Sequence, residues 1–404
     1  MKYPNYLMLI SFKLKFKYLL ICCMLCLSRY HFAQEVTKIT VNPLDLRQGN
    51  YTLSDLAESI EYIPLETNDK CLIGSIYYFD ISENYIIVYC PQTLNLYLFD
   101  RNGHFISQIG KHGEGPQDYL GYSISCLLID EKRNRIIVHD KHQCKQLVFD
   151  LRGRFVSSVT MDEKTGTGHY ERLYNDLFFI YTNNYNGNMP FVYEIRDINL
   201  QLMSENIKTV YFKRGQGVSM IGTPRHYLYN NKIQWKETSL NDTIYTVEND
   251  CSFKPKYVVN AGKHEVTPEL SATPDIFKFR QRMREYVNFD LFFETQDKLL
   301  ISYIFGNRKY YYCYYDKNDQ ALLYFKSDKG IPNDYDGGLD FWPTRQDNNT
   351  LYAFYDAYLF TEHLSGMKKE GLKGNPKDIK SFKKMMQILD PEDNPVLMIV
   401  KLKE

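Results

Sequence analysis

The chain carries no net charge, has only 2 tryptophans, and lacks any run of basic residues that would mark a nucleic-acid surface. Its 404 residues include 49 basic and 49 acidic side chains. Proteins that bind DNA or RNA depend on an excess of positive charge, because neutralising phosphates supplies much of their affinity. We therefore expect no nucleic-acid partner.

Beyond residue 33, paired cysteines of the CxxC kind are also absent, which removes the usual spacing of zinc ligands and redox dithiols from that part of the chain. Six of the nine cysteines lie beyond residue 33, mostly in apolar, strand-like segments such as 89–90 and 312–314. In that setting a cysteine is typically a small buried apolar residue. Disulfides are the alternative, because six is an even number and the chain is predicted below to reach an oxidising compartment.

Motifs that signal a common catalytic mechanism are missing. The sequence has no Gly-x-Ser-x-Gly elbow, no His-Glu-x-x-His helix and no cysteine–histidine nucleophile setting. It therefore offers no positive evidence for an enzyme, and we assign no catalytic residue.

The apolar run near the N-terminus is too short to cross a bilayer comfortably. It covers residues 18–27 and follows the lysine-rich residues 13–17, a pattern typical of a signal peptide rather than a membrane helix. We predict a signal peptide over residues 1–33, with cleavage after Ala33. The mature chain would then have no transmembrane segment and would reach the periplasm, the cell surface or the medium.

A lipid anchor is the alternative to free export. It could be carried by Cys22, Cys23 or Cys26, but these cysteines are not preceded by the small residues of a bacterial lipobox. Removal of residues 1–33 takes away five basic residues and no acid, so the mature chain carries a net charge of −5.

Two stretches fifty residues apart have almost the same sequence. Residues 99–107 read Phe-Asp-Arg-Asn-Gly-His-Phe-Ile-Ser, and residues 149–157 read Phe-Asp-Leu-Arg-Gly-Arg-Phe-Val-Ser. Each predicts a strand, a tight Asp-x-x-Gly turn and a second strand. A unit that recurs at this interval is typical of a β-propeller, and the 35 Tyr and 24 Phe of the chain also favour strands.

The repeat pattern predicts an all-β fold, a six-bladed β-propeller with short helical inserts. The first two blades cover residues 73–109 and 123–159, and later copies drift in sequence. Three further strands are expected at 191–197, 242–247 and 310–315. Two helical inserts are expected at 274–287 and 376–389. A seven-bladed ring is the alternative.

The two ends of the chain are predicted to close the ring. Residues 34–58 are interpreted as an irregular leader, and residues 59–404 as the six-bladed propeller. Residues 60–65 alternate between apolar and polar and indicate a strand, as do residues 396–402. An open ring would leave unpaired strand edges, so we expect these two strands to share the last sheet.

Short motifs in the chain resemble those of known propellers. Residues 99–119 resemble an NHL-type repeat. More closely, the chain resembles a largely uncharacterised six-bladed β-propeller family of Bacteroides and its relatives, through residues 62–67, 99–103, 110–119, 242–245 and 394–397. The resemblance implies an exported or lipidated protein of the bacterial cell envelope and says little about activity.

The loop at residues 333–343 is the candidate ligand site. It places Asp334, Asp336 and Asp340 close to Trp342 in a glycine-rich segment. Carboxylates beside an aromatic ring suit a sugar, whose hydroxyls take hydrogen bonds while its apolar face stacks on the ring, or a cation. The alternative is a solvated turn whose Trp342 packs into the core.

Two other polar stretches are interpreted as turns. Residues 110–119 are rich in glycine but lack the following helix and the Lys-Ser or Lys-Thr pair of a phosphate loop. Residues 139–142, His-Asp-Lys-His, are interpreted as a solvated turn between strands.

These features predict a non-catalytic exported propeller that binds a protein, peptide or carbohydrate ligand and needs no cofactor. The alternative is a metal-dependent hydrolase or lyase, in which inward side chains of the central channel hold a divalent metal such as calcium.

Overall fold

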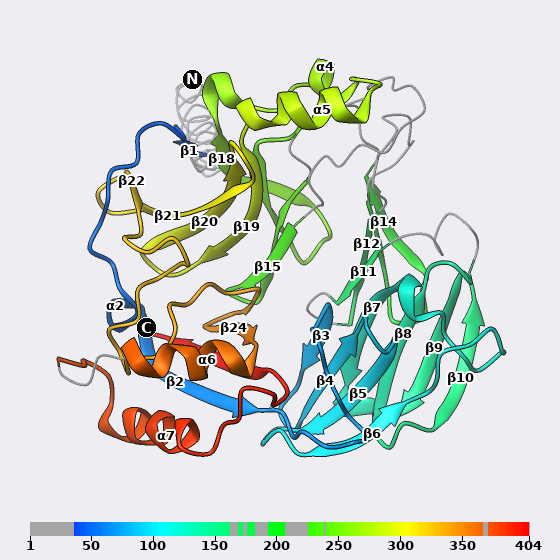
Figure 1. Cartoon of the computed structure of the whole chain (residues 1–404). Coiled ribbons are helices and arrows are strands. Elements are labelled where there is room, and N and C mark those ends of the chain that lie inside the picture. The colour runs from blue at the N-terminus through cyan, green and yellow to red at the C-terminus, as the bar shows by residue number, and fades with distance from the viewer. Residues whose placement is uncertain are drawn as a thin grey trace, which may run out of the picture. The chain divides into compact units, whose positions relative to one another are not determined.

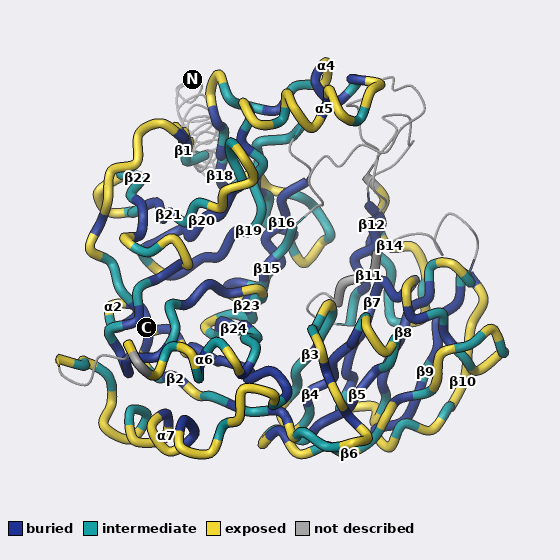
Figure 2. The backbone as a smooth tube through the Cα atoms, in the orientation of Figure 1, coloured by how far each residue is buried: buried dark blue, intermediate teal, exposed yellow. Residues whose placement is uncertain are grey.

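The computed structural model describes residues 36–161, 169–172, 176–181, 193–206, 225–237, 240–366 and 371–403. The compact unit that begins at Ile39 is mostly strand with a few short helices. Its strands form the successive sheets of a β-propeller arrangement (Figure 1). Buried residues follow the strands and exposed residues gather in the connecting turns (Figure 2).

Four sheets have four strands each, and in every one the strands pair antiparallel with their neighbours along the chain. The first two are β3 (Tyr78–Ile81), β4 (Tyr85–Cys90), β5 (Asn95–Asp100) and β6 (Phe105–Ile109), then β7 (Ile124–Asp130), β8 (Arg135–Asp140), β9 (Lys145–Asp150) and β10 (Phe155–Thr160). The others are β11 (His169–Arg172), β12 (Phe178–Tyr181), β13 (Tyr193–Arg196) and β14 (Leu202–Asn206), then β19 (Asn288–Glu294), β20 (Lys298–Phe305), β21 (Lys309–Asp316) and β22 (Ala321–Tyr324).

The fifth sheet has nine strands and contains both early and late parts of the chain. In spatial order they are β1 (Thr37–Thr40), β18 (Phe253–Asn260), β17 (Thr243–Val247), β16 (Lys232–Lys236), β15 (Arg225–Tyr229), β23 (Arg345–Asp347), β24 (Thr350–Tyr355), β25 (Val396–Leu402) and β2 (Ala57–Pro64).

Helices occupy the connections. The α-helices are α2 (Leu53–Leu56), α4 (Pro268–Ser271), α5 (Ile276–Arg282), α6 (Ala357–His363) and α7 (Pro376–Met386). The 3₁₀ turns are η1 (Gly121–Ser123), η2 (Glu131–Arg133), η3 (Gly262–His264), η4 (Met283–Glu285) and η5 (Leu364–Gly366). The inserts expected at 274–287 and 376–389 thus contain helices α5 and α7.

The region interpreted as an irregular leader, residues 34–58, is partly regular. It contains α2, whose Leu53 and Leu56 are buried, and the first residues of β2. Its apolar residues lie too far apart to suggest an element by periodicity, and burial against the rest of the unit forms the short helix instead.

The structure does not have the six separate four-stranded sheets that the sequence predicts. It has four, and two further groups of strands are merged into the nine-stranded sheet. A single parallel pair, Leu228 with Asp347, joins β15 to β23. The N–H of Asn348 also donates to the carbonyl of Leu228 at 2.9 Å. This pair and this hydrogen bond connect the two groups of strands into one continuous sheet.

The repeated Asp-x-x-Gly segments fold into the same turn. In the first, the Asp100 carboxylate accepts the backbone N–H groups of Asn102 at 2.8 Å and His104 at 2.9 Å, while Gly103 donates to the Asp100 carbonyl. In the second, the Asp150 carboxylate accepts the two equivalent N–H groups at 2.9 Å each. The aspartate is therefore needed to hold the backbone of the turn.

The same turn recurs where the sequence no longer reveals it. The Asp197 carboxylate accepts the N–H groups of Asn199 at 2.9 Å and Gln201 at 2.8 Å. Leu200, at φ 64°, stands where the earlier copies have glycine, and in a fourth copy Cys251 does so at φ 62°. Because other residues can adopt this conformation at some cost, the geometry persists while the sequence signal fades.

Neighbouring sheets share apolar clusters, so each four-stranded group of strands is packed against the next. Within the described residues, each group of strands shares such a cluster with the group that follows it in the chain. Representative members of the clusters are Leu98 and Val138, Ile137 and Phe178, Phe179 and Trp235, Ile244, Phe293 and Val400, and Leu397 and Ile86.

The first and last long strands of the unit lie side by side. β2 pairs antiparallel with β25, with Ile60 opposite Val400 and Ile63 opposite Leu397. β25 pairs on its other edge with β24. The last sheet therefore combines a strand from near the N-terminus with strands from the C-terminal part of the chain.

Buried Asn394 reinforces this junction. Its side-chain NH₂ donates to the carbonyls of Glu66 at 2.7 Å and Cys71 at 2.6 Å, and its Oδ1 accepts the N–H of Ile73 at 2.8 Å. Its own N–H donates to Thr67 Oγ1 at 2.8 Å. One amide thus satisfies three backbone groups, and its bonds to Cys71 and Ile73 are buried.

Four of the six cysteines beyond the predicted signal peptide are buried in the structure. This agrees with their interpretation as small apolar core residues.

Substitution Gly103→Ala should lower the free energy of unfolding by roughly 2–4 kcal/mol. Gly103 lies at φ 88°, and a Cβ there would collide with the Pro64 carbonyl oxygen on β2. Gly306→Ala is the matched control, because Gly306 lies at φ 68° with nothing within 4 Å, so it reports backbone strain of about 1–2 kcal/mol alone. Urea denaturation measures both; equal losses would show that the close approach to β2 does not matter.

Substitution Asn394→Ala should destabilise the protein by roughly 2–4 kcal/mol, because it leaves the buried Ile73 N–H and Cys71 carbonyl without the amide as partner. Asn349→Ala, at an exposed position beside the same sheet, should change stability by less than about 0.5 kcal/mol. Chemical denaturation followed by tyrosine fluorescence compares them. A loss in Asn394→Ala no larger than in the control would contradict the assigned role.

Candidate functional site

The predicted ligand loop, residues 333–343, connects β22 to β23 and lies against the start of α2. Its first carboxylate, Asp334, accepts the N–H and the hydroxyl of Ser54 at 2.9 and 2.8 Å and pairs with Lys373 at 2.7 Å. Burial disfavours its charge, but these partners outweigh burial and lower the pKa of Asp334. Asp334 therefore anchors the segment that enters α2.

Asp336 is fully buried and belongs to the turn itself. Its Oδ1 accepts from the side chain of Asn333 at 2.8 Å and from the N–H of Gly338 at 2.9 Å. Burial raises the pKa of Asp336. The ring of Tyr62 covers this turn, since its hydroxyl oxygen would lie 2.7 Å from a Cβ on Gly338.

Asp340 and Trp342 hold the far end of the loop. Asp340 accepts the N–H of Asn333 at 2.9 Å, which closes the loop on itself. Trp342 is only 9% exposed, and its ring lies 4.8 Å from that of Tyr312 and 6.1 Å from that of Phe325, centroid to centroid. The tryptophan thus packs in the core.

The structure therefore gives each of the three carboxylates hydrogen-bond partners within the protein, with Asn333 shared by Asp336 and Asp340. In the part of the chain that the structure describes, no group of three or more His, Cys, Asp or Glu side chains could hold a metal ion. The chemistry of the loop, as described, is that of a hydrogen-bonded turn that supports its neighbours.

An exposed aromatic surface lies next to Trp342, on β21, and the sequence analysis did not single it out. Tyr310 and Tyr312 occupy alternate positions of the strand and so face the same side. Their rings are 6.3 Å apart, centroid to centroid, and almost parallel, with 13° between their planes. Tyr310 is 44% exposed. We call Tyr310, Tyr312 and Trp342 the tyrosine surface.

The signal for this surface was present in the sequence as the run Lys309-Tyr-Tyr-Tyr-Cys-Tyr-Tyr. Successive tyrosines of a strand face opposite sides, but both sides can be core in a propeller blade. Here Tyr311 stacks on Tyr303, at 5.1 Å and 9°, on the other face. Only the packing of the neighbouring sheet decides which face stays exposed.

Polar groups flank the tyrosine surface. Arg225 of β15 donates to the Asp290 carboxylate at 2.8 Å and to the Asp290 carbonyl at 2.9 Å. Partial burial and then the charge of Asp290 raise the pKa of Tyr310, while Arg225 lowers it. Burial, Tyr310, Asp290 and Asp328 together raise the pKa of Tyr312. The ion pair thus lies within electrostatic reach of both phenols.

A second charged cluster, centred on Glu294, is structural. The Glu294 carboxylate is 1% exposed and accepts from Tyr257 at 2.8 Å, Lys256 at 2.7 Å and Lys317 at 2.8 Å, as well as from Tyr227. Burial lowers the pKa of Lys256, and Glu294 opposes that shift. These four donors satisfy the Glu294 carboxylate. The cluster therefore connects β15, β18 and β19 and is not a ligand site.

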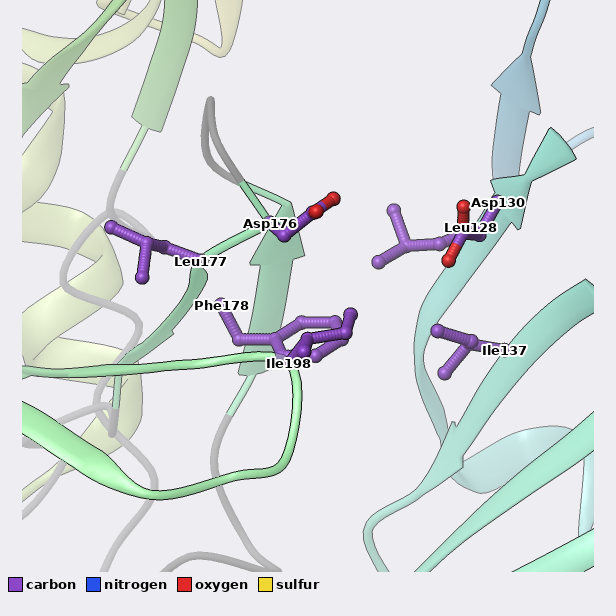
Figure 3. A pocket seen from close by; sticks show the side chains of 7 residues that line it. All are labelled: Leu128, Asp130, Ile137, Asp176, Leu177, Phe178 and Ile198. Carbon is purple, nitrogen blue, oxygen red and sulfur yellow. The ribbon is translucent and has the colours of Figure 1, made fainter. Parts of the chain in front are cut away.

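A small cavity lies between sheets β7–β10 and β11–β14. Its volume is about 10 Å³, roughly the space of one water molecule. Figure 3 shows Leu128, Ile137 and Phe178 along its apolar wall. It is a packing seam between two sheets, since no organic ligand fits it.

The interpretation of residues 139–142 as a solvated turn is wrong for its first two members, because His139 and Asp140 are fully buried. The Asp140 carboxylate accepts the N–H groups of Leu120, His142 and Gln143. It therefore ties the end of β8 to the preceding loop. Polar residues at the end of a strand suggest exposure to solvent, but here the backbone of another segment covers them.

None of the described helices is long and apolar enough to cross a membrane.

Comparisons with known proteins bear on the fold and the family. The model of a family named Domain of unknown function (DUF4934) matches residues 37–401. No curated protein matches the chain. A crystal structure of a protein from Bacteroides fragilis NCTC 9343, named as a candidate for export, is similar over 91% of this chain and 100% of its own, with TM-score 0.66 and 18% identity.

Two more distant structures are similar over most of the chain. A member of the DUF4221 family from Bacteroides vulgatus ATCC 8482 has TM-score 0.49 and 11% identity, covering 86% of this chain and 97% of its own. Virginiamycin B lyase from Staphylococcus aureus has TM-score 0.38 and 9% identity, covering 84% and 98%. At these identities, likeness concerns the fold only.

Substitution Asp336→Asn tests whether the loop carboxylate is structural. The folded-state pKa of Asp336 is raised, so its ionisation costs stability once the pH exceeds the pKa of the unfolded chain, near 4. Asparagine keeps the Oδ1 acceptor without the charge. We expect the variant to be at least as stable as the wild type at pH 7, with the difference vanishing below about pH 4.

Urea denaturation across this pH range measures the effect. Asp334→Asn is the matched comparison, because Asp334 has the opposite shift and its variant should be less stable at pH 7 and should converge with the wild type in acid. A marked loss of stability in Asp336→Asn at pH 7 would contradict the structural role.

Proposed function

We propose that this chain, which belongs to the DUF4934 family of unknown function, is a non-catalytic, exported β-propeller that binds a ligand or partner in the bacterial cell envelope. The observation that carries the proposal is the tyrosine surface, where exposed Tyr310 lies beside half-buried Tyr312, which packs against Trp342. Exposed, rigid tyrosines give contact area at little cost in conformational entropy.

The position of this surface supports the proposal. Arg225 comes from β15, the tyrosines from β21, and Trp342 from the loop before β23. Residues from three groups of strands thus meet at one surface, as expected where propeller loops converge.

We further propose that the unit has six blades within the domain plan 59–404. The nine-stranded sheet would comprise two blades, β15–β18 and β23–β25 with β2, joined at the Leu228–Asp347 pair. Each of the six groups shares an apolar cluster with the next, and the last group shares one with the first, which supports a closed ring.

Export is proposed from the N-terminal pattern and from likeness to a protein named as a candidate for export. Signal peptide cleavage after Ala33, and a final location in the periplasm, at the cell surface or in the medium, belong to this proposal. A divalent metal such as calcium has no observation in its favour among the described residues.

A ligand screen by thermal shift tests the proposed function. Soluble peptides and oligosaccharides are added to the exported protein, and a true ligand should raise its melting temperature through mass action. The same ligand should stabilise Tyr310→Ala much less and should be recovered chemically unchanged. Ligands that stabilise wild type and Tyr310→Ala alike, or that are converted to products, would overturn the proposal.

A further inference from the structure

We propose that the outer face of α5 docks on a membrane surface that contains anionic phospholipid. This inference goes beyond the proposed function, because the surface concerned includes none of the residues of the tyrosine surface. It follows from three features of residues 276–284, which we call the basic segment: an amphipathic spacing, an exposed phenylalanine and a concentration of basic side chains.

Apolar packing fixes one side of the basic segment to the rest of the unit. Phe279 is 3% exposed and lies in a cluster with Val266 and Leu270, and Ile276 and Met283 pack against that cluster. The three apolar residues of the segment follow each other at i, i+3 and i+7, which is the spacing of one helix face. The opposite face therefore points away from the core, at the periphery of the unit (Figure 2).

Phe277 lies on this outward face and is not a member of the cluster around Phe279. Its side chain is 77% exposed, the highest value among the large apolar side chains that the structure describes. A single exposed apolar residue is common on soluble proteins and carries no conclusion alone. Its meaning here comes from the charges around it.

Basic side chains flank the exposed ring. Lys278, Arg280, Arg282 and Arg284 are all exposed, and residues 276–284 include no acidic residue, so the basic segment carries a charge of +4. Within the described part of the chain, none of the four forms an ion pair. The predicted mature chain, in contrast, carries a net charge of −5. Positive charge is thus concentrated on one helix of an acidic protein.

The neighbouring acidic residues lie at the ends of the segment or outside it. Asp275 caps α5, and its carboxylate accepts the N–H groups of Phe277 at 2.8 Å and Lys278 at 3.0 Å. Glu285 follows at the end of η4, and Glu269 belongs to α4. Because hydrogen bonds hold the Asp275 carboxylate against the helix backbone, the outer face between the two ends keeps its positive charge.

A basic face around an exposed aromatic ring suits an anionic lipid surface. Each Lys or Arg near such a surface strengthens binding by about fivefold, and an apolar side chain beside it enters the boundary between headgroups and acyl chains. An acidic peptide or a free polyanion would be attracted by the charges alone and would not need the ring. The pairing of Phe277 with the basic residues therefore favours a membrane, and the proposed export would bring the protein to one.

Co-sedimentation with lipid vesicles tests the inference. The exported protein, whose intact mass shows that residues 1–33 are removed, is mixed with vesicles of about 30% phosphatidylglycerol in phosphatidylcholine and with vesicles of phosphatidylcholine alone. The anionic vesicles should bind at least about tenfold more tightly, and about 500 mM salt should abolish most of this difference. Phe277→Ala should weaken binding to the anionic vesicles by roughly fivefold. The double variant Lys278→Gln/Arg284→Gln should weaken it by roughly tenfold or more.

Matched variants near α7 separate the site from general effects of charge and exposure. Lys380→Gln/Lys384→Gln removes the same charge from another exposed helix face, and Ile388→Ala removes an apolar side chain that is 75% exposed. Both should bind within about twofold of wild type. Phe277→Leu keeps an apolar side chain and should bind within about threefold. Circular dichroism confirms that each variant is folded.

The remaining outcomes overturn the inference. If anionic and neutral vesicles bind alike, or neither binds, no docking on anionic lipid exists. If Phe277→Ala and Lys278→Gln/Arg284→Gln bind as wild type does, or the variants near α7 lose as much, the site is not α5. If poly-glutamate binds through Lys278 and Arg284 while vesicles do not, the partner is an acidic polymer. None of these results bears on the tyrosine surface, which the thermal-shift screen with Tyr310→Ala tests separately.

Discussion

The antiparallel pairing of β2 with β25 is the constraint on which the rest of the unit depends. Residues near the two ends of the chain, such as Ile60 and Val400, are opposite each other in one ladder. Every sheet between them is packed against its neighbours through apolar clusters. Loss of this pairing would free two strand edges and uncover the apolar faces on both sides, because no later element covers them.

Polar contacts between the sheets reinforce that arrangement. Arg345 of β23 donates to the Asp80 carboxylate of β3 at 2.6 Å, and Asp80 also accepts the N–H of Ile129 on β7 at 2.7 Å. The side chain of Gln346 exchanges two hydrogen bonds with the backbone of Glu294. Asp80 and Gln346 are buried and Arg345 is half-buried where strands of different sheets approach, and each makes hydrogen bonds to backbone groups of another sheet.

Aromatic residues serve two purposes in this molecule. Several tyrosines are core residues whose hydroxyls find a partner, as in the Tyr303–Tyr324 pair at 2.7 Å. Tyr310 and Tyr312 differ because their strand face looks away from the buried Tyr303 and Tyr311 stack. The same residue type thus builds the blade and the candidate site, and position within the sheet decides which role it has.

The candidate loop at 333–343 illustrates how far sequence reasoning reached. Composition predicted a ligand loop there, and Trp342 of this loop lies against Tyr312. The carboxylates accept from backbone N–H groups: Asp334 from Ser54 of α2, far away in the sequence, Asp336 from Gly338 and Asp340 from Asn333. Spacing along the chain cannot reveal this, because a short loop offers its carboxylates many partners and only the folded path selects them.

What the sequence determined by itself is the repeating unit: the all-β class, the Asp-x-x-Gly turn, the helical inserts and the apolar cysteines all follow from local patterns of residues. Local rules suffice there because a turn or an amphipathic strand is stabilised by residues close in the chain. The tertiary structure alone decided that β15 and β23 merge, that His139 and Asp140 are buried, and that Tyr310 is exposed. These depend on which distant segments come together, and burial by a distant segment leaves no mark on the spacing of the residues it covers.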